Sequence, residues 1–146
     1  MPDFDDFKRL VQVARTEVEE IDADDMRRRV AEGAVLVDVR DESELRRNPP
    51  LARAVHLSRG QLEYTITDAV DDKDTSIVLY CAAGMRSVLA ARTLQSLGYR
   101  HVAVLRDGLQ ALRLAAGQPW YPLYPPATDT GEADDPDAGD DEQTAS

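Results

Sequence analysis

The chain contains one cysteine, Cys81, and two histidines among its 146 residues. An internal disulfide framework is therefore impossible. A zinc finger, an iron–sulfur ferredoxin or a multi-histidine metal site would lack the ligands that it needs. Aromatic residues make up only 5% of the chain, although 42% of it is hydrophobic. This composition predicts one domain with a core of aliphatic side chains, and we expect neither a metal nor a cofactor.

Long apolar runs and an excess of basic residues are absent as well. No segment approaches the roughly 20 apolar residues of a membrane span, and the start of the chain is acidic, unlike a signal peptide. The formal charge of −11 argues against a nucleic-acid binder, which needs an excess of Lys and Arg. We therefore expect a soluble cytoplasmic protein without nucleic-acid or membrane partners. The reducing cytosol suits a lone thiol.

Charge and composition divide the chain into segments. Residues 129–146 hold eight of the 28 acidic residues and no Lys or Arg, which predicts a disordered acidic tail. The Pro-rich aromatic segment 120–128 is expected to run in extended form over the domain surface. We expect residues 1–19 to form an additional N-terminal helix and residues 20–119 to form the folded domain.

Hydrophobic periodicity locates the expected helices and strands. In the N-terminal helix, over 3–18, apolar residues recur every three or four positions. This apolar seam packs on its own domain or forms a dimer contact, and we expect a monomer or a weak homodimer. After it, Val-rich strands alternate with helices, which predicts a parallel sheet with helices on both faces. The expected strands are 34–39, 54–57, 77–80 and 102–105; the expected helices are 23–32, 41–47, 61–69, 87–97 and 109–116.

One segment carries candidate chemistry. The apolar strand 77–80 ends at Cys81, a six-residue loop runs from Cys81 to Arg86, and a largely apolar helix begins directly after it. In open parallel sheets, ligands bind beyond the carboxyl ends of the strands. The backbone N–H groups of a tight strand-to-helix loop form an anion-binding nest, to which the start of the helix adds its positive dipole end.

The residues of this loop favour a reactive cysteine. Ala82, Ala83 and Gly84 are small enough for the backbone to curl, and Arg86 adds a permanent positive charge. These features favour the thiolate, which is both a nucleophile and a good leaving group. On residue type alone, Cys81 is equally well an inert small hydrophobic residue, but the surrounding pattern favours the nucleophile. The candidate catalytic residue is Cys81, and the candidate loop and substrate-binding residues are Ala82, Ala83, Gly84, Met85, Arg86 and Ser87.

Three blocks of the sequence resemble the single-domain rhodanese-like sulfurtransferases. They are residues 36–44, which include Asp-Val-Arg and two glutamates, residues 54–60, and residues 78–87 around the cysteine. The resemblance covers about residues 20–119, and the third block carries most of it. Two phrases typical of the family differ: Gly-His-Ile-Pro-Gly is absent, and Asp107-Gly108-Leu109 stands where Gly-Gly-Trp is usual. The resemblance implies a five-stranded parallel sheet flanked by helices on both faces.

The resemblance also implies a reaction. Cys81 takes a sulfane sulfur from a small donor such as thiosulfate and passes it, as a persulfide, to a thiophilic acceptor such as cyanide or a thiol. Because the chain has no second cysteine, the acceptor is an external molecule. Arg86 then orients an anionic donor or, alternatively, forms a surface ion pair. Arg59 is a weaker candidate for donor binding and is equally compatible with a solvated loop residue.

Three further polar residues close to the matching blocks have structural interpretations. Asp38 and Arg40 are expected to support the architecture through buried hydrogen bonds that fix the neighbouring loops. His56 is interpreted as a hydrogen-bonded residue at a strand end, because a preformed thiolate needs no general base.

Two other functions stay open. A rhodanese-like regulatory or persulfide-carrier module has no fast turnover, and regulatory modules generally lack the loop cysteine that this chain keeps. A Cys-dependent phosphatase or arsenate reductase uses a related Cys–Arg loop, and the related cell-cycle phosphatases have one more loop residue. Only four residues lie between Cys81 and Arg86 here, a length that fits a persulfide sulfur and crowds a tetrahedral oxyanion. The sequence therefore favours a sulfurtransferase.

Overall fold

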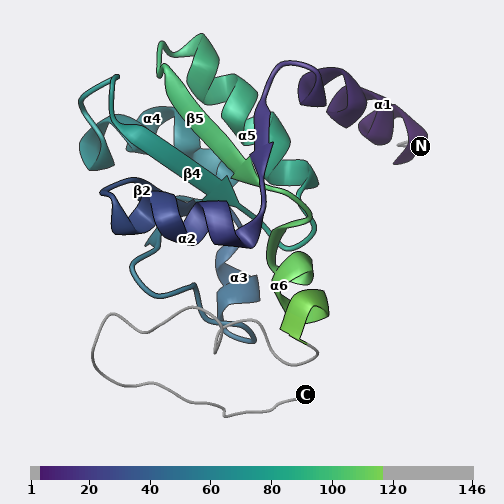
Figure 1. Ribbon diagram of the computed structural model, residues 1–146. Helices are drawn as coiled ribbons and strands as arrows, with labels where there is room; N and C mark the ends of the chain where they lie inside the picture. Colours follow the sequence, from purple (N-terminus) through teal and green to yellow (C-terminus); the bar gives the residue numbers. More distant parts are fainter. Residues whose placement is uncertain (1–3, 117–146) are drawn as a thin grey trace.

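A computed structural model describes residues 4–116, and five parallel strands form its centre (Figure 1). The strands lie in the order β1-β5-β4-β2-β3, and every neighbouring pair is parallel. Their bounds are β1 Glu19–Ile21, β2 Val35–Asp38, β3 Val55–His56, β4 Ser76–Tyr80 and β5 His101–Leu105. The carboxyl ends of all five strands therefore meet at one edge of the sheet, as the sequence predicts. The expected extended segment 120–128 and the acidic tail lie outside the described residues.

Helices connect the strands and cover both faces of the sheet (Figure 1). They are α1 Phe4–Arg15, α2 Ala23–Ala31, α3 Glu42–Leu45, α4 Leu62–Ala69, α5 Met85–Ser96 and α6 Gly108–Ala116, with a 3-10 turn, η1, at Arg59–Gln61. Residues of α1, α4 and α5 share one hydrophobic cluster with the sheet, whereas residues of α2 and α6 share the other. None of the helices within residues 4–116 has the length and apolarity needed to cross a bilayer.

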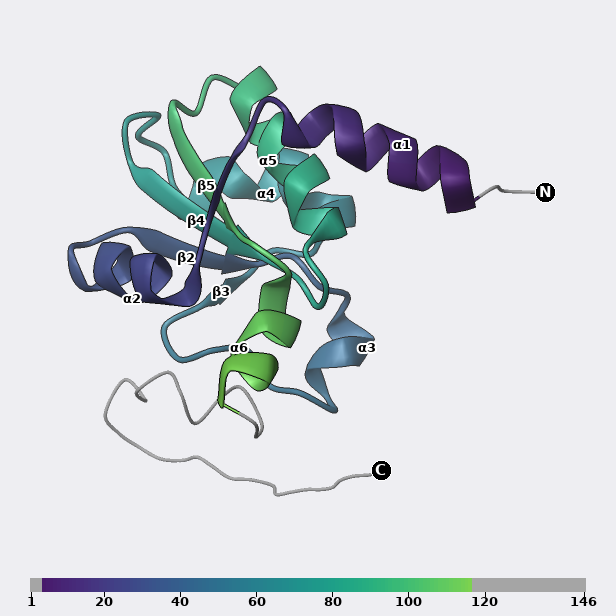
Figure 2. The ribbon, with the colours of Figure 1, turned by 45° about the vertical axis from the view of Figure 1, so that its right-hand side comes forward.

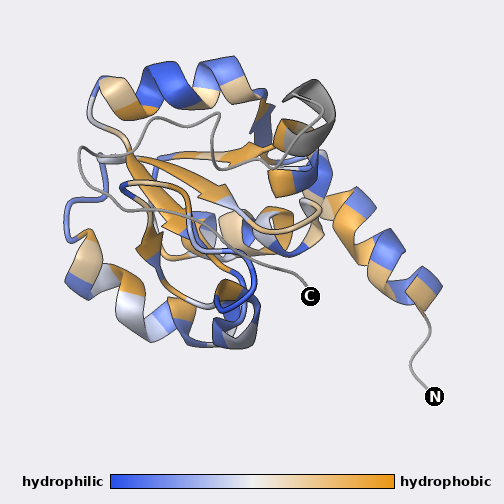
Figure 3. Ribbon diagram, turned by 90° about the horizontal axis from the view of Figure 1, so that it is seen from below, coloured by the Kyte–Doolittle hydropathy of each residue, from blue (hydrophilic) through white to orange (hydrophobic). Residues whose placement is uncertain are grey.

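Alternation along the central strand β4 explains the two clusters. Ile77 and Leu79 belong to the cluster of α1, α4 and α5, whereas Val78 and Tyr80 belong to that of α2 and α6. Successive side chains of a strand point to opposite faces, so a strand covered on both sides is apolar throughout. In Figure 3 the hydrophobic strands accordingly lie between helices whose outer surfaces are largely hydrophilic.

The structure differs from the sequence prediction at the start of the chain. The helix expected to reach residue 18 ends at Arg15, and the short strand β1, which the periodicity did not reveal, begins at Glu19. This strand pairs only with β5 and is polar over two of its three residues, so no apolar run marks it. It is the fifth strand that the family resemblance implies.

The apolar seam of α1 packs on the domain over only part of its length. Val11 and Ala14 are buried against the cluster that includes α5. Phe4, Leu10 and Val13 remain exposed, and Figure 2 shows the helix extending away from the sheet. Contact with its own domain thus explains the apolar seam only toward the C-terminal end of this helix.

Candidate active site

Cys81 directly follows the central strand β4, and its side chain is buried, with 1% of the residue exposed. Its Sγ accepts a hydrogen bond from the N–H of Gly84 at 3.1 Å. The Oγ of Ser87 lies 3.4 Å from Sγ, and this hydroxyl donates its proton to the carbonyl of Gly84 at 3.2 Å. Because a hydroxyl has one proton, a protonated Cys81 would donate to Ser87 Oγ.

The loop after Cys81 holds several backbone N–H groups without an acceptor. Gly84 has a φ of +95° and serves as the N-cap of α5. The amides of Ala82, Ala83, Met85 and Arg86 make no hydrogen bond to any other described residue. Unpaired amides at a helix start are suited to an anion. Together with the Gly84 N–H, which contacts the sulfur, they are the free donors that an anion-binding nest of the kind predicted from the sequence requires.

Arg86 lies at the mouth of this loop, but its guanidinium is bound to Glu44. Two N–H···O bonds join them, with distances of 2.7 and 2.9 Å. The paired arginine, together with the N–H of Asp41, lowers the pKa of Glu44 to about 2. In turn, Glu44 raises the pKa of Arg86. In the sequence, Glu44 is marked only as part of the first family block, and no local pattern joins it to Arg86, which lies 42 positions later.

A pocket of about 390 Å³ lies beside the loop. Its lining residues are Asp41, Arg59, Gly60, Leu62, Glu63, Arg86 and Thr93. The structure thus brings Arg59 and Arg86 to one pocket, although they are far apart in the sequence. Arg59 makes no ion pair with any described residue, so its charge is available to an anion.

Asp38 and Arg40 form a buried ion pair behind the loop. The Arg40 side chain donates to both carboxylate oxygens of Asp38, and the shortest of these contacts is 2.7 Å. Tyr80 donates to the same carboxylate at 2.8 Å and accepts from the N–H of Leu51 at 2.8 Å. Burial, and next the negative charge of Asp38, raise the pKa of Tyr80. His56 Nε2 donates to the Arg40 carbonyl at 2.7 Å. The network joins the loops that contain Arg40 and Leu51 to the carboxyl ends of β2, β3 and β4, which suits the supporting role expected for Asp38 and Arg40.

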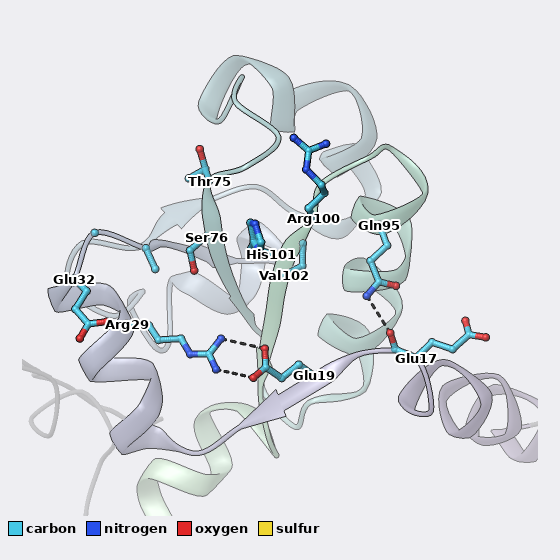
Figure 4. A pocket seen from close by; sticks show the side chains of 12 residues that line it. Glu17, Glu19, Arg29, Glu32, Thr75, Ser76, Gln95, Arg100, His101 and Val102 are labelled. Carbon is cyan, nitrogen blue, oxygen red and sulfur yellow. Dashed lines mark hydrogen bonds and ion pairs between the residues drawn. The ribbon is translucent and has the colours of Figure 1, made fainter.

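A larger pocket, of about 790 Å³, lies at the opposite end of the sheet (Figure 4). Several of its polar side chains are already engaged, and Arg100 pairs with Asp74 just outside the pocket. Arg29 donates to Glu19 at 2.6 and 3.1 Å, and Gln95 donates to the Glu17 carbonyl at 3.0 Å. Neither Cys81 nor any residue of its loop lines this pocket.

The class of protein follows from comparison with known sequences. A family model described as the rhodanese-like domain matches residues 22–115, most of the described chain. The chain belongs to the rhodanese-like family. A relative called a sulfurtransferase, from Allochromatium vinosum, is 32% identical over 96 residues, which make up 64% of this chain and 87% of that protein.

Solved structures share the same fold. A protein of unknown function from Rhodopseudomonas palustris, described as a possible tyrosine phosphatase, is 31% identical with a TM-score of 0.69, covering 78% of this chain and 92% of that one. A polysulfide-sulfur transferase homodimer from Wolinella succinogenes is 28% identical with a TM-score of 0.64, covering 77% and 85%. Membership of the family and the shared fold support sulfurtransferase activity in general.

Proposed function

We propose that the protein transfers a sulfane sulfur from an anionic donor such as thiosulfate, through a persulfide on Cys81, to cyanide or a thiol. One observation carries this proposal. The only sulfur nucleophile lies at the carboxyl edge of the sheet, bound by one amide and next to four amides that lack an acceptor. Such a nest stabilises negative charge on sulfur in both halves of the reaction.

In the first half-reaction, the Cys81 thiolate attacks the outer, sulfane sulfur of thiosulfate. A bond forms between Sγ and this sulfur, the sulfur–sulfur bond of thiosulfate breaks, and its electron pair leaves with sulfite. The persulfide that remains carries a negative charge on its terminal sulfur. The free amides of the loop, including those of Ala82 and Ala83, are placed to bind that charge.

In the second half-reaction, the acceptor attacks the terminal sulfur of the persulfide. Cyanide leaves as thiocyanate, or a thiolate leaves as a new persulfide, and the electron pair of the breaking bond returns to Sγ. Ser87 supports this step, because its hydroxyl can turn from the Gly84 carbonyl to the restored thiolate. No proton transfer to a general base is required.

Arg59 supplies donor binding in this proposal, and Arg86 supplies mainly position. Nη1 and Nη2 of Arg86 are engaged by Glu44, so its charge is partly neutralised. Arg59 borders the same pocket with no acidic partner among the described residues. A doubly charged donor therefore gains more from Arg59 than the sequence suggests.

The same contacts weigh against the phosphatase alternative, which the relative from Rhodopseudomonas palustris keeps open. A phosphoryl group needs donors for several oxygens around the nucleophile. Here the loop is short, the sulfur is almost fully buried and Arg86 is bound to a carboxylate. A terminal sulfur atom fits this environment better than a tetrahedral group.

Intact-mass measurement after incubation with thiosulfate tests the proposal. The wild-type protein should gain one sulfur atom, and cyanide should then remove it and yield thiocyanate. Cys81→Ser is the control and should gain none. A persulfide that forms but is not turned over supports the carrier alternative. Hydrolysis of an aryl phosphate that depends on Cys81 would contradict the proposal in favour of the phosphatase.

A further inference from the structure

The Cys81 loop packs backbone against backbone on the turn that opens α6. The N–H of Leu109 donates to the carbonyl of Cys81 at 3.0 Å, and the N–H of Gln110 donates to the carbonyl of Ala82 at 3.1 Å. These two amides belong to the first turn of α6, whose N–H groups have no partner within the helix. The first two carbonyls of the active-site loop therefore serve as the acceptors for the start of the last helix.

Two glycines allow this close approach. A Cβ atom on Gly108 would lie 2.2 Å from the Cys81 carbonyl oxygen and 2.9 Å from the Ala82 carbonyl, where no side chain fits. A Cβ on Gly84 would lie 3.0 Å from the backbone nitrogen of Asp107. Both glycines also have positive φ values, +57° and +95°, which residues with a side chain rarely adopt. The loop and the turn thus interlock through a glycine on each side.

This contact decides which way the loop amides point. A trans peptide is planar, so its N–H and its C=O point in opposite directions. Because the carbonyls of Cys81 and Ala82 point toward α6, the N–H groups that follow them, on Ala82 and Ala83, point away from α6. Both N–H groups are among those without an acceptor. If either peptide rotated, its amide would be lost from the nest.

We propose that Gly108 is a positioning residue for sulfur transfer: it lets the α6 amides hold the first two loop carbonyls, so that the N–H groups of Ala82 and Ala83 stay turned away from α6 and free to bind the reacting sulfur. The proposal rests on the sulfur-transfer function proposed above and extends it to a residue outside the Cys81–Ser87 loop. It also gives a physical reason why the second glycine of the usual Gly-Gly-Trp phrase is kept in this chain, whereas an aspartate takes the first position with a φ of +61°.

Gly108→Ala in the full chain is the direct test, and Gly33→Ala is its matched control. Gly33 has a φ of +110° and open space where a Cβ would lie, so its substitution adds backbone strain without a clash. We expect Gly108→Ala to lower kcat/KM for thiosulfate about a hundredfold, the effect of a misplacement of roughly 1 Å. The midpoint of the pH profile for alkylation by iodoacetamide should move to higher pH, because fewer amides stabilise the thiolate. Gly33→Ala should lose thermal stability and keep both the rate and the profile.

Gln110→Pro covers the case in which Gly108→Ala does not fold. Proline removes the N–H that binds Ala82 and is tolerated in the first turn of a helix. We expect it to shift the alkylation profile in the same direction, whereas Gln110→Ala, which keeps the N–H, should leave it unchanged. The Gln110 side chain is exposed, so neither variant removes a core side chain.

The alkylation profile separates this inference from the proposed function. If the wild-type protein forms no persulfide but Gly108→Ala still shifts the profile, the sulfur-transfer proposal fails, and Gly108 still positions the amides that stabilise the Cys81 thiolate. If folded Gly108→Ala, or Gln110→Pro in its place, keeps the wild-type profile and kcat/KM, the role of Gly108 is structural only and the inference is overturned.

Discussion

The two ends of the sheet carry two pockets of opposite character. At the amino ends of the strands, the pocket is about twice as large, and its Arg29 is bound by Glu19 in a bidentate ion pair. At the carboxyl ends, the pocket is smaller, yet the loop beside it contains a buried sulfur and a set of unpaired amides. The difference lies in the buried nucleophile and the free amides around it rather than in the size of the hollow.

This contrast follows from the direction of the strands and from the helices that come after them. A helix that begins at the carboxyl edge points its unpaired N–H groups into that edge. α5 begins there after Cys81, and α6 begins there after β5. Helices that precede the strands end at the opposite edge. The fold therefore concentrates hydrogen-bond donors at one end only, where an anion can use them.

The largest effect is expected for the nucleophile. Cys81→Ser should lower sulfur transfer from thiosulfate to cyanide by at least about a thousandfold, the scale on which loss of a catalytic nucleophile acts. Thermal unfolding should change little, because serine is similar in size. Turnover at the wild-type rate would show that Cys81 is not the nucleophile.

Substitutions of the two arginines that line the smaller pocket should have different kinetic effects. Arg59→Ala should raise KM for thiosulfate roughly tenfold and leave kcat almost unchanged, because it removes a charge that acts in binding. Arg86→Ala, unlike Arg59→Ala, should also slow the alkylation of Cys81 near pH 7, because it releases α5 from Glu44 and removes a nearby positive charge. Equal effects of the two substitutions on alkylation would remove the distinction between binding and positioning.

Tyr80→Phe tests the buried network behind the carboxyl edge. It removes the donor to Asp38 and leaves the buried N–H of Leu51 without an acceptor. We expect a loss of about 1–3 kcal/mol in the free energy of unfolding, measured by urea denaturation. Tyr64→Phe is the control: Tyr64 is 69% exposed, so its substitution should have no measurable effect.

The ion pair of Glu44 should make stability depend on acid pH. Its pKa is about 2 in the folded protein, below the roughly 4.3 of a free glutamate. The pair therefore stabilises the fold fully above about pH 5, and the contribution is lost as the pH falls toward 2. Glu44→Gln should be less stable at neutral pH by about 1 kcal/mol or less. The difference from wild type should disappear in acid. Glu63→Gln serves as the control, because Glu63 lines the same pocket as Arg86 but forms no ion pair with any described residue.

The smallest effect is expected at the amino edge. Glu19→Gln breaks the bidentate pair with Arg29, which lies at the surface, and should change stability by less than about 1 kcal/mol. The kinetics of sulfur transfer should not change. A clear fall in kcat/KM for this variant would show that the larger pocket takes part in the reaction, contrary to the comparison above.

Local patterns predicted the central strands, the parallel sheet and the cysteine loop, because each depends on residues that are neighbours in sequence. The apolar run before Cys81 and the small residues after it are sufficient to indicate a strand and a tight loop. They give no information on partners distant in sequence. Glu44 beside Arg86 and Tyr80 beside Leu51 are contacts of this kind, 42 and 29 positions apart.

The sequence also misses features whose signal is weak by nature. β1 has three residues and a polar pattern, so only its pairing with β5 reveals it. The close contact of Gly108 with Cys81 depends on the packing of two backbones, and the residues between them give no sign of it. Both the strand β1 and the contact of Gly108 are therefore visible only in the tertiary structure.

The strands at the two margins of the sheet are very short: β1 has three residues and β3 has two. A long exposed margin with free N–H and C=O groups can pair with the margin of another copy and start aggregation. Here each margin offers only a few such groups, and the side chains of Glu19 and Glu20 on β1 are held in ion pairs with Arg29 and Arg15. The central strands, which are the most apolar, are enclosed between these margins. The order of the strands thus protects the sheet against edge-to-edge pairing with another copy in a crowded solution.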